Sequence, residues 1–225
     1  MIEFDTEKHE YKVEGKVKPS VTQILRGVNL SPRFDGISDV DMTWYMDRGT
    51  MVHKAMHHIC DWTIKNRDKL APPEASQILR EYISSQDEVI RGYINSAMTF
   101  LGHALIEPEI RQTELPVYSE SQDFCGTIDL IADVEFDGVE HKNAIIDFKC
   151  GQPNYVNAFQ LAGYAMAFDP TDYRDRLRFG VYLDKKGREA KICPYKDIGD
   201  FQVFKSARYL YGKLEELNLV KKEKL

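Results

Sequence analysis

The chain has 225 residues, 43% of them hydrophobic and 29% charged, with a net charge of −6 at pH 7. This length allows one domain with a sizeable core, and the negative balance argues against a protein that coats nucleic acid nonspecifically through Lys and Arg. The sequence lacks an apolar run of the roughly 20 residues that cross a bilayer and lacks a signal-peptide pattern. We therefore expect a cytoplasmic protein that does not bind membranes.

The first part of the chain predicts a β-hairpin followed by helices. Residues 2–18 alternate apolar and charged side chains around Gly15, which favours the hairpin, and Ser20 is a suitable N-cap for a short helix. Apolar residues at helical spacing predict one helix or two in succession over about 41–69. Ala-Pro-Pro interrupts this segment, and a further helical stretch is expected over about 74–105.

Strands are expected after Pro108. The pattern predicts strands over 110–118, 126–136 and 144–148, a helix over 157–168, strands over 177–183 and 189–193, and a final helix over about 197–217. Asp137-Gly138 is typical of a turn between the second and third strands. We therefore expect a single domain of α/β class, with a hairpin and helical wall (1–105), a sheet with one helix (106–195) and a C-terminal helix (196–225).

Two aspartates and a lysine stand on neighbouring predicted strands. Asp129 lies in one strand, and Asp147, Phe148 and Lys149 come at the end of the next. Because residues two apart on a strand face the same side, Asp147 and Lys149 are expected to point together while Phe148 turns into the core. Clustered carboxylates hold Mg²⁺ or Mn²⁺, and a neighbouring lysine can orient the attacking water in phosphodiester hydrolysis. The triplet alone is common, so its meaning depends on the rest of the chain.

Burial gives a second reason to single out these aspartates. A carboxylate between Ile128 and Leu130, or directly after the apolar run 144–146, is costly to bury unless it is paired or binds a metal. Asp133 shares a face with Asp129 four residues further on and is its main rival. The alternative for each aspartate is a solvated polar position on a half-buried strand.

The motifs, taken in their order along the chain, resemble the RecB-like branch of the PD-(D/E)XK nuclease superfamily. They are Arg48-Gly49-Thr50-Met51-Val52-His53, Gly126-Thr127-Ile128-Asp129, Asp147-Phe148-Lys149 and Gln160-Leu161-Ala162-Gly163-Tyr164. Upstream of them, residues 19–25 are similar to a segment that opens many phage RecB-like nucleases and the mitochondrial genome-maintenance exonuclease. The resemblance covers roughly residues 19 to 183 and implies the PD-(D/E)XK (restriction-endonuclease-like) core, a small mixed β-sheet flanked by helices.

Some relatives add an iron–sulfur cluster held by four cysteines. The cysteines of this chain have no C-x-x-C spacing and lie far apart in the sequence, at Cys60, Cys125, Cys150 and Cys193. We therefore expect reduced thiols, with neither an iron–sulfur cluster nor a zinc site.

The resemblance implies a metal centre for one or two Mg²⁺ or Mn²⁺ ions. Asp129, Asp147 and His53 would be ligands, the main-chain carbonyl of Phe148 would complete the shell, and Lys149 would be the catalytic lysine. Helical phase does not single out His53, because two more histidines follow closely, at positions 57 and 58.

A glutamate is a further candidate ligand. Glu114 matches a family glutamate upstream of the Gly-x-x-Asp element and would bind metal directly or through water. An exposed position on the strand is the alternative for it, and Glu107, Glu109 and Glu120 are also available.

The remaining motif residues are expected at the DNA. Gln160 and Tyr164 share a helix face, and the resemblance implies that they contact the strand or help to place the lysine, although a tyrosine on such a helix is normally part of the core. Arg48 and Thr50 belong to the histidine motif, in which the intervening glycine would let backbones approach closely. Trp44 could stack on bases of a single strand, but core packing is its more usual role.

The resemblance implies a metal-dependent DNA exonuclease that acts on single-stranded DNA or DNA ends, in recombination, replication or repair, in a bacterium or a phage-infected host. A recombination or replication protein is a candidate partner. Two alternatives remain, a structure-specific endonuclease of the same fold and an inactive DNA-binding accessory protein. The intact Asp129, Asp147 and Lys149 argue against the second of these.

Overall fold

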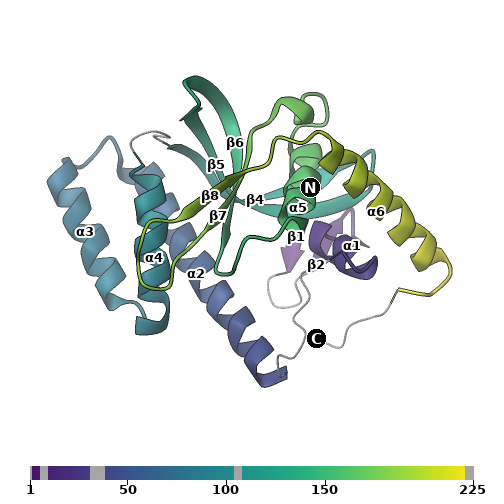
Figure 1. The fold of residues 1–225 in the computed structure, drawn as a ribbon, viewed down its shortest axis with the longest axis horizontal. Helices are drawn as coiled ribbons and strands as arrows, with labels where there is room; N and C mark the ends of the chain where they lie inside the picture. Colours follow the sequence, from purple (N-terminus) through teal and green to yellow (C-terminus); the bar gives the residue numbers. More distant parts are fainter. Residues whose placement is uncertain (1, 6–9, 31–38, 104–107, 221–225) are drawn as a thin grey trace.

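The computed structural model describes residues 2–5, 10–30, 39–103 and 108–220. Within these ranges the chain has the expected α/β class, with a three-stranded sheet, a five-stranded sheet and six α-helices (Figure 1). The expected end of a helix at 105 and the alternative ligand Glu107 lie outside the described residues.

The N-terminal hairpin is part of a small antiparallel sheet in the order β1-β2-β3, made of β1 (Ile2–Asp5), β2 (Glu10–Val13) and β3 (Lys16–Lys18). Val13 pairs with Lys16, and the two residues between them, Glu14 and Gly15, have φ values of 51° and 73°. Positive φ at both central residues is the geometry of a tight hairpin turn, so the turn predicted around Gly15 is confirmed.

Ser20 caps helix α1 (Val21–Gly27), as its sequence position predicts. Its Oγ accepts a hydrogen bond from the backbone N–H of Gln23 at 3.1 Å, and Oε1 of Gln23 accepts one from the backbone N–H of Ser20 at 2.8 Å. This reciprocal capping box satisfies two N–H groups that the first helical turn cannot pair internally.

Three longer helices follow. The first is one continuous helix, α2 (Asp39–Asn66), and the single stretch predicted after it is two helices, α3 (Pro72–Ser85) and α4 (Glu88–Leu101). The break occurs because Gln86 leaves helical geometry with ψ 158° and Asp87 begins a new helix, its side chain accepting from the N–H of Val89 at 2.9 Å. Among the described helices, none is long and apolar enough to cross a membrane.

The larger sheet has the order β4-β5-β6-β7-β8. Its strands are β4 (Glu109–Ser119), β5 (Phe124–Phe136), β6 (Val139–Lys149), β7 (Arg178–Tyr182) and β8 (Lys191–Pro194). The first three form an antiparallel meander, α5 (Val156–Phe168) crosses over to β7, which runs parallel to β6, and β8 is antiparallel at the edge. The predicted turn at Asp137-Gly138 is confirmed. Because the turn is tight, Phe136 and Val139 on either side of it still pair, so β6 begins earlier than expected.

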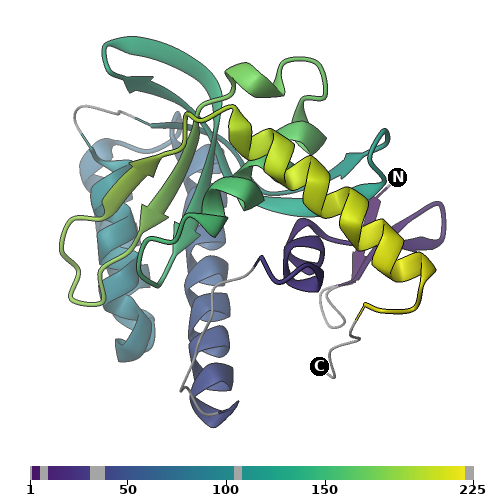
Figure 2. The ribbon, with the colours of Figure 1, turned by 45° about the vertical axis from the view of Figure 1, so that its right-hand side comes forward.

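Helices cover both faces of this sheet (Figures 1 and 2). Apolar residues of α2 and α4 form one core with side chains from β5, β6 and β7, while α1, α5 and α6 (Gly199–Glu216) form a second core on the opposite face. Phe148 lies in the first core and packs edge-on against Phe100 of α4 at a centroid distance of 6.2 Å. The prediction that Phe148 turns into the core is thus confirmed, and it leaves Asp147 and Lys149 on the other side of β6.

Candidate metal centre

The candidate ligands converge from one helix and three strands. His53 comes from α2, Glu114 from β4, Asp129 from β5, and Asp147 and Lys149 from β6. His53, Glu114 and Asp129 each offer one ligand atom, and these three atoms lie within 4.8 Å of one another. Residues far apart in the sequence therefore meet in a space that one cation could bridge.

His53 is the histidine that reaches the carboxylates. Its Nδ1 lies 3.3 Å from Oδ1 of Asp129, and its side chain is 30% exposed. Burial disfavours the protonated ring, but the carboxylate of Asp129 outweighs that effect and raises the pKa of His53 to about 9. His57 instead lies 3.3 Å from the hydroxyl of Thr113, and the ring of His58 stacks on Tyr82. The structure thus separates three histidines that helical phase alone left equivalent.

Asp129 is held in place by a backbone hydrogen bond from the next strand. The N–H of Phe148 donates to Oδ2 of Asp129 at 2.8 Å. Burial alone would raise the pKa of Asp129, but His53 and Lys149 outweigh it and lower that pKa below its ordinary value. The carboxylate is therefore ionised and oriented before any ligand arrives.

The regular alternation of β5 is broken at Asp129. Ile128 packs in the core with α5, and Leu130 in the core with α2, although residues two apart on a regular strand share a face. The irregularity lies opposite Glu114, whose neighbours Thr113 and Leu115 pair with Leu130 and Ile128.

Glu114 has φ +48°, in the left-handed region that residues other than glycine rarely adopt. Such a backbone costs on the order of 1–3 kcal/mol and is found disproportionately at functional sites. Burial raises the pKa of Glu114 to about 7, and the negative charge of Asp129 adds to the rise. Of the other described glutamates considered for this role, Glu109 pairs with Arg67 and Glu120 is exposed, so Glu114 is the one that reaches the site.

Asp147 and Lys149 point together, as expected from their spacing on β6. Nζ of Lys149 lies 2.6 Å from Oδ2 of Asp147, whose side chain is only 3% exposed. Apart from this ion pair, the buried Oδ2 has no hydrogen-bond partner among the described residues. Burial raises the pKa of Asp147 to about 6 against the effect of Lys149, and the pKa of Lys149 is itself raised because Asp147 and Asp129 outweigh its burial.

These donors fit a divalent cation. His53, Glu114 and Asp129 form the close group of ligand atoms, and Asp147 and Lys149, which pair with each other, lie near enough to Asp129 to affect its charge and to be affected by it. Oxygen ligands of this kind suit Mg²⁺ or Mn²⁺, and an imidazole is an ordinary ligand of the latter. A buried carboxylate oxygen without a hydrogen bond is also the kind of atom that a cation would satisfy.

Asp133, the alternative to Asp129, is bound by other residues of the sheet. Arg111 donates to its Oδ2 from Nη2 at 2.6 Å and from Nε at 3.0 Å, and the backbone N–H of Asn143 donates to Oδ1 at 2.8 Å. These partners account for the buried carboxylate without a metal. Asp133 therefore stabilises the β4–β5–β6 meander rather than the candidate centre.

Gln160 and Tyr164 are brought beside the carboxylates. Nε2 of Gln160 donates to the hydroxyl of Tyr164 at 2.8 Å, and Tyr164 is 6% exposed. A Cβ at Gly126 would lie 2.6 Å from the ring of Tyr164, so the glycine of the Gly-x-x-Asp motif makes room for this ring. Burial raises the pKa of Tyr164, and the charges of Asp147 and Asp129 raise it further. The two motifs are thus joined by direct contact.

The first turns of α2 hold the remaining motif residues. The guanidinium of Arg48 lies 4.9 Å from the ring centroids of Trp44, Tyr45 and Tyr93, and its NH2 donates to the carbonyl of Cys150 at 3.3 Å. Trp44 is 48% exposed, so the expectation that it packs in the core is wrong. The reason is that this end of α2 extends beyond the sheet (Figure 1).

Thr50 and Gly49 lie beside Arg48 on α2. The hydroxyl of Thr50 is exposed and donates to the carbonyl of Met46 within the helix at 3.1 Å. Within the described ranges of the chain, a Cβ at Gly49 would meet nothing within 4 Å, so the described residues show no close backbone approach there.

Two tyrosines near the site are absent from the motifs. The hydroxyl of Tyr11, on β2, lies 2.7 Å from that of Thr127, and its pKa is raised to about 12 by burial, with the charges of Glu114 and Asp129 contributing. Tyr182 on β7 is the register partner of Lys149 and bonds Tyr195 at 2.6 Å. Neither stands near a motif in the sequence, so only the folded chain reveals them.

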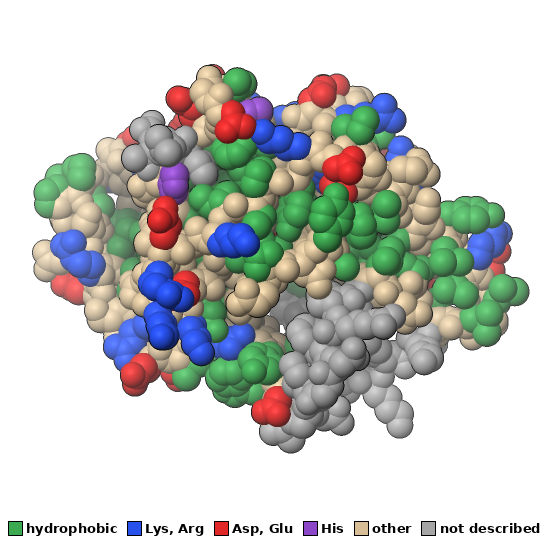
Figure 3. Space-filling view, in the orientation of Figure 1, with side chains coloured by type: hydrophobic (Ala, Val, Ile, Leu, Met, Phe, Trp, Pro, Cys, Tyr) green, Lys and Arg blue, Asp and Glu red, His purple; other side chains and the backbone are tan. Residues whose placement is uncertain are grey.

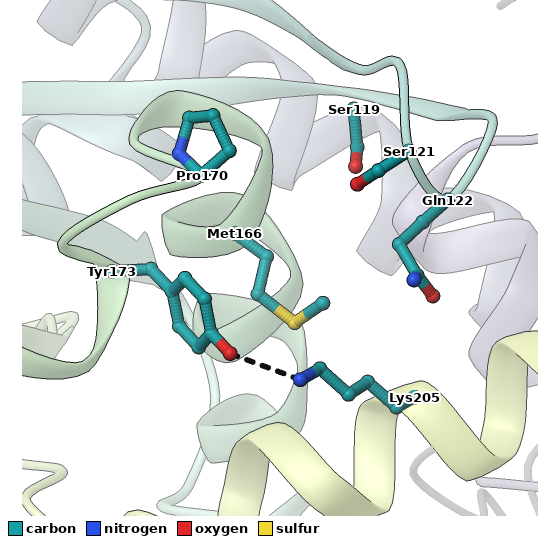
Figure 4. Close-up of a pocket in the computed structure, with 7 residues that line it drawn as sticks. All are labelled: Ser119, Ser121, Gln122, Met166, Pro170, Tyr173 and Lys205. Atoms are coloured by element: carbon teal, nitrogen blue, oxygen red, sulfur yellow. Dashed lines mark hydrogen bonds between the residues drawn. The ribbon is translucent and has the colours of Figure 1, made fainter.

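A separate hollow of about 210 Å³ lies between the β4–β5 turn, α5 and α6 (Figure 4). Its polar lining includes Ser119 and Gln122, and Nζ of Lys205 donates to the hydroxyl of Tyr173 at 2.9 Å across it. Among the described residues its lining includes no carboxylate and no histidine. As far as the described residues show, this hollow offers none of the metal-ligating groups that meet at His53, Glu114 and Asp129.

No protein-family model matches the chain, and no curated protein matches it significantly.

Proposed function

We propose that the chain is a metal-dependent DNA nuclease with a PD-(D/E)XK core of the RecB-like branch, and that it degrades DNA from ends as an exonuclease. The observation that carries the proposal is that His53, Glu114 and Asp129 each place a ligand atom in one small group, with the Asp147–Lys149 pair beside Asp129. The antiparallel β4–β6 meander, followed by a helix and a parallel strand, supports the same assignment.

His53, Asp129 and Asp147 would hold Mg²⁺ or Mn²⁺, with Glu114 as a further ligand and the carbonyl of Phe148 as a main-chain one. Such an ion polarises the phosphate and lowers the pKa of bound water. The protein supplies the orientation: the N–H of Phe148 fixes Asp129, and Asp129 in turn fixes the ring of His53.

Lys149 would act as a fixed positive charge. Its pKa is raised, so the ammonium stays protonated at neutral pH, and the adjacent Asp147 limits its movement. An ammonium in this position stabilises negative charge that develops on the phosphate and holds the nucleophilic water through a hydrogen bond. This role needs no covalent intermediate with the protein.

The decisive experiment is cleavage of end-labelled linear single-stranded DNA, with circular DNA of the same sequence alongside, in Mg²⁺ or Mn²⁺. The intact protein is compared with Lys149→Ala and with Lys142→Ala, which removes an exposed lysine from the same strand. Degradation of linear DNA alone, lost only in Lys149→Ala, would support an exonuclease. Cleavage of circles would assign an endonuclease instead, and the absence of metal-dependent cleavage of either DNA would leave a binding protein.

The biological setting follows from the resemblance alone. We propose that the chain acts in recombination, replication or repair, in the cytoplasm of a bacterium or of a phage-infected host, beside a recombination or replication protein. Purification of the chain from such cells, with identification of the proteins that bind it, tests this part separately from cleavage.

A further inference from the structure

Basic side chains gather where the loop between β7 and β8 meets the start of α4 (Figure 3). This basic loop, residues 183–190, carries Lys185, Lys186 and Arg188, all exposed, and α4 contributes Arg91. Arg188 pairs with Asp184 at 2.6 Å, whereas the ammonium groups of Lys185 and Lys186 pair with no carboxylate within the described part of the chain. Because the whole chain has a net charge of −6, this concentration of positive charge is local.

The basic loop is fixed against α4. The backbone N–H of Asp184 donates to the buried hydroxyl of Ser96 at 2.9 Å, and the N–H of Lys186 donates to Oδ1 of Asp184 at 2.7 Å. A Cβ at Gly92 would lie 1.8 Å from the carbonyl oxygen of Lys185, so this approach requires glycine. The backbone that carries the two lysines is thus held in one position beside Arg91.

The basic loop also begins beside the candidate centre. The N–H of Leu183 donates to the carbonyl of Lys149 at 2.8 Å, and Tyr182 is the register partner of Lys149. Pairing of β7 with β6 ends at Tyr182, and Lys185 comes shortly after that residue in the sequence.

The exposed tip of α2 adjoins the same end of β6. Arg48 donates to the carbonyl of Cys150, the residue after Lys149, and its guanidinium contacts the rings of Trp44 and Tyr45. It also contacts Tyr93, which directly follows Gly92 on α4. Trp44 and Tyr45 are 48% and 41% exposed, so two adjacent aromatic rings and the basic loop border one strand end.

We propose that one DNA strand crosses this face with its phosphates on Lys185, Lys186 and Arg91 and its bases on Trp44 and Tyr45. Lys and Arg bind phosphates by releasing their counterions, and exposed aromatic rings bind bases that are unstacked. A duplex keeps its bases stacked inside, so it offers these rings no partner. This strand track rests on the proposed function, because it assigns the route by which a strand reaches the end of β6.

The test measures binding of a fluorescent oligothymidine by anisotropy, with EDTA present, over a series of KCl concentrations. The variants are Lys185→Ala/Lys186→Ala and Trp44→Ala. The matched control, Lys16→Ala/Lys213→Ala, changes the net charge equally with two exposed lysines on β3 and α6. A blunt duplex of the same length is measured in parallel.

The lysine variant should bind more weakly, and its salt dependence, the slope of log affinity against log salt, should fall by about 0.7 for each lost phosphate contact. Trp44→Ala should bind the single strand about tenfold more weakly with an unchanged salt slope, and the control should bind like the intact protein. The track would be overturned if the control and the lysine variant lost affinity equally. It would also be overturned if both track variants bound the single strand as tightly as the intact protein does. Binding of the duplex as tight as that of the single strand would overturn it as well.

Hydrolysis of bis(p-nitrophenyl) phosphate in Mn²⁺ separates this inference from the proposed function. This small diester needs the candidate centre but has no further nucleotides that could lie along the strand track. Hydrolysis by the intact protein and by both track variants, together with weaker strand binding by the variants, supports both proposals. If the intact protein hydrolyses neither this ester nor DNA while the track variants still weaken binding, the nuclease function fails and the strand track remains. If hydrolysis occurs and binding is unaffected, only the track fails.

Discussion

Nδ1 of His53, on helix α2, lies 3.3 Å from Oδ1 of Asp129, on strand β5. The contact ties the helical side of the molecule to the sheet at the point where the carboxylates gather. The contact also makes a proton compete with a metal ion for the imidazole. The pKa of His53 is raised to about 9, so the ring carries a proton at neutral pH when no cation is bound. A metal ligand must give up that proton.

We accordingly expect the affinity for Mn²⁺ to rise with pH. The pKa values of Asp147, Glu114 and His53 are raised to about 6, about 7 and about 9. As the pH rises through these values each group loses its proton without the help of a cation, so the competition weakens and affinity should increase from about pH 6 to about pH 9. Calorimetric titration in buffers of different ionisation enthalpy measures both the affinity and the protons released.

His53→Gln should remove the upper part of this rise, because the group with the highest pKa is lost. His57→Gln is the matched control, since its ring contacts Thr113 and not Asp129. An affinity for Mn²⁺ that does not change with pH would contradict the assignment of His53 as a ligand.

Ionised Glu114 should lower the free energy of unfolding of the protein, so its effect should depend on pH. Its pKa is raised from 4.5 to about 7, so the folded protein holds the proton more tightly than the unfolded chain does, and stability is lost as the pH rises towards 7. Glu114→Gln removes this loss and should raise the free energy of unfolding at pH 8 by on the order of 1–2 kcal/mol, while lowering nuclease activity. Chemical denaturation at pH 5 and pH 8 measures the effect, which should be small at the lower pH.

Glu109→Gln serves as the control for this substitution. Glu109 lies on the same strand but pairs with Arg67 and Arg111 at the surface, so its replacement should change stability by less than about 1 kcal/mol and leave activity unchanged. A loss of stability in Glu114→Gln at pH 8 would show that the charge is already compensated within the protein.

Local signals in the sequence located much of this arrangement. The capping serine Ser20, the turn at Asp137-Gly138 and the two-residue spacing of Asp147 and Lys149 depend on neighbouring residues only, and each has the expected geometry. Their success follows because caps, tight turns and strand alternation are set by a few consecutive residues.

Other features depend on contacts between distant segments and were not accessible from the sequence. The left-handed backbone of Glu114 arises within the pairing of β4 and β5, and the approach of Tyr11 to Thr127 depends on how the small sheet docks. The motif singled out Asp129, but the partner that satisfies its rival Asp133, the guanidinium of Arg111, could not be identified from the sequence. Helix propensity likewise left the exposure of Trp44 open, because exposure depends on where α2 extends past the sheet.

The two aspartates of β5 should respond differently to the same change. Asp133→Asn loses the ion pair with Arg111 but keeps an acceptor for the N–H of Asn143, so we expect a stability loss of about 1 kcal/mol and activity within about threefold of the intact protein. Asp129→Asn should lower metal-dependent cleavage by at least about 100-fold, because a carboxylate ligand is lost. Cleavage rates measured at saturating Mn²⁺, with denaturation curves for both variants, make the comparison. The reverse ranking of activities would transfer the metal site to Asp133.

Gly126→Ala should disturb the site through Tyr164. The added Cβ would lie 2.6 Å from the ring of Tyr164 and 3.4 Å from Val21, so the ring must move away from the carboxylates, at a cost of about 1–3 kcal/mol in stability and with reduced cleavage. The same substitution in a Tyr164→Ala background should cost little, because the ring it meets is gone. Unfolding free energies of the four proteins in this double-mutant cycle give the coupling directly, and we expect about 1–2 kcal/mol.

Gly49→Ala is the control for the same added methyl group. A Cβ at Gly49 meets no described residue within 4 Å, and the residue lies inside α2, so alanine should stabilise the protein by up to about 1 kcal/mol through its helix propensity. A coupling near zero between positions 126 and 164 would mean that the ring and strand β5 adjust independently, and Tyr164 would then have no fixed place beside Asp129 and Asp147. A large coupling together with a stabilising Gly49→Ala would show that the glycine of one motif is required by the tyrosine of the other.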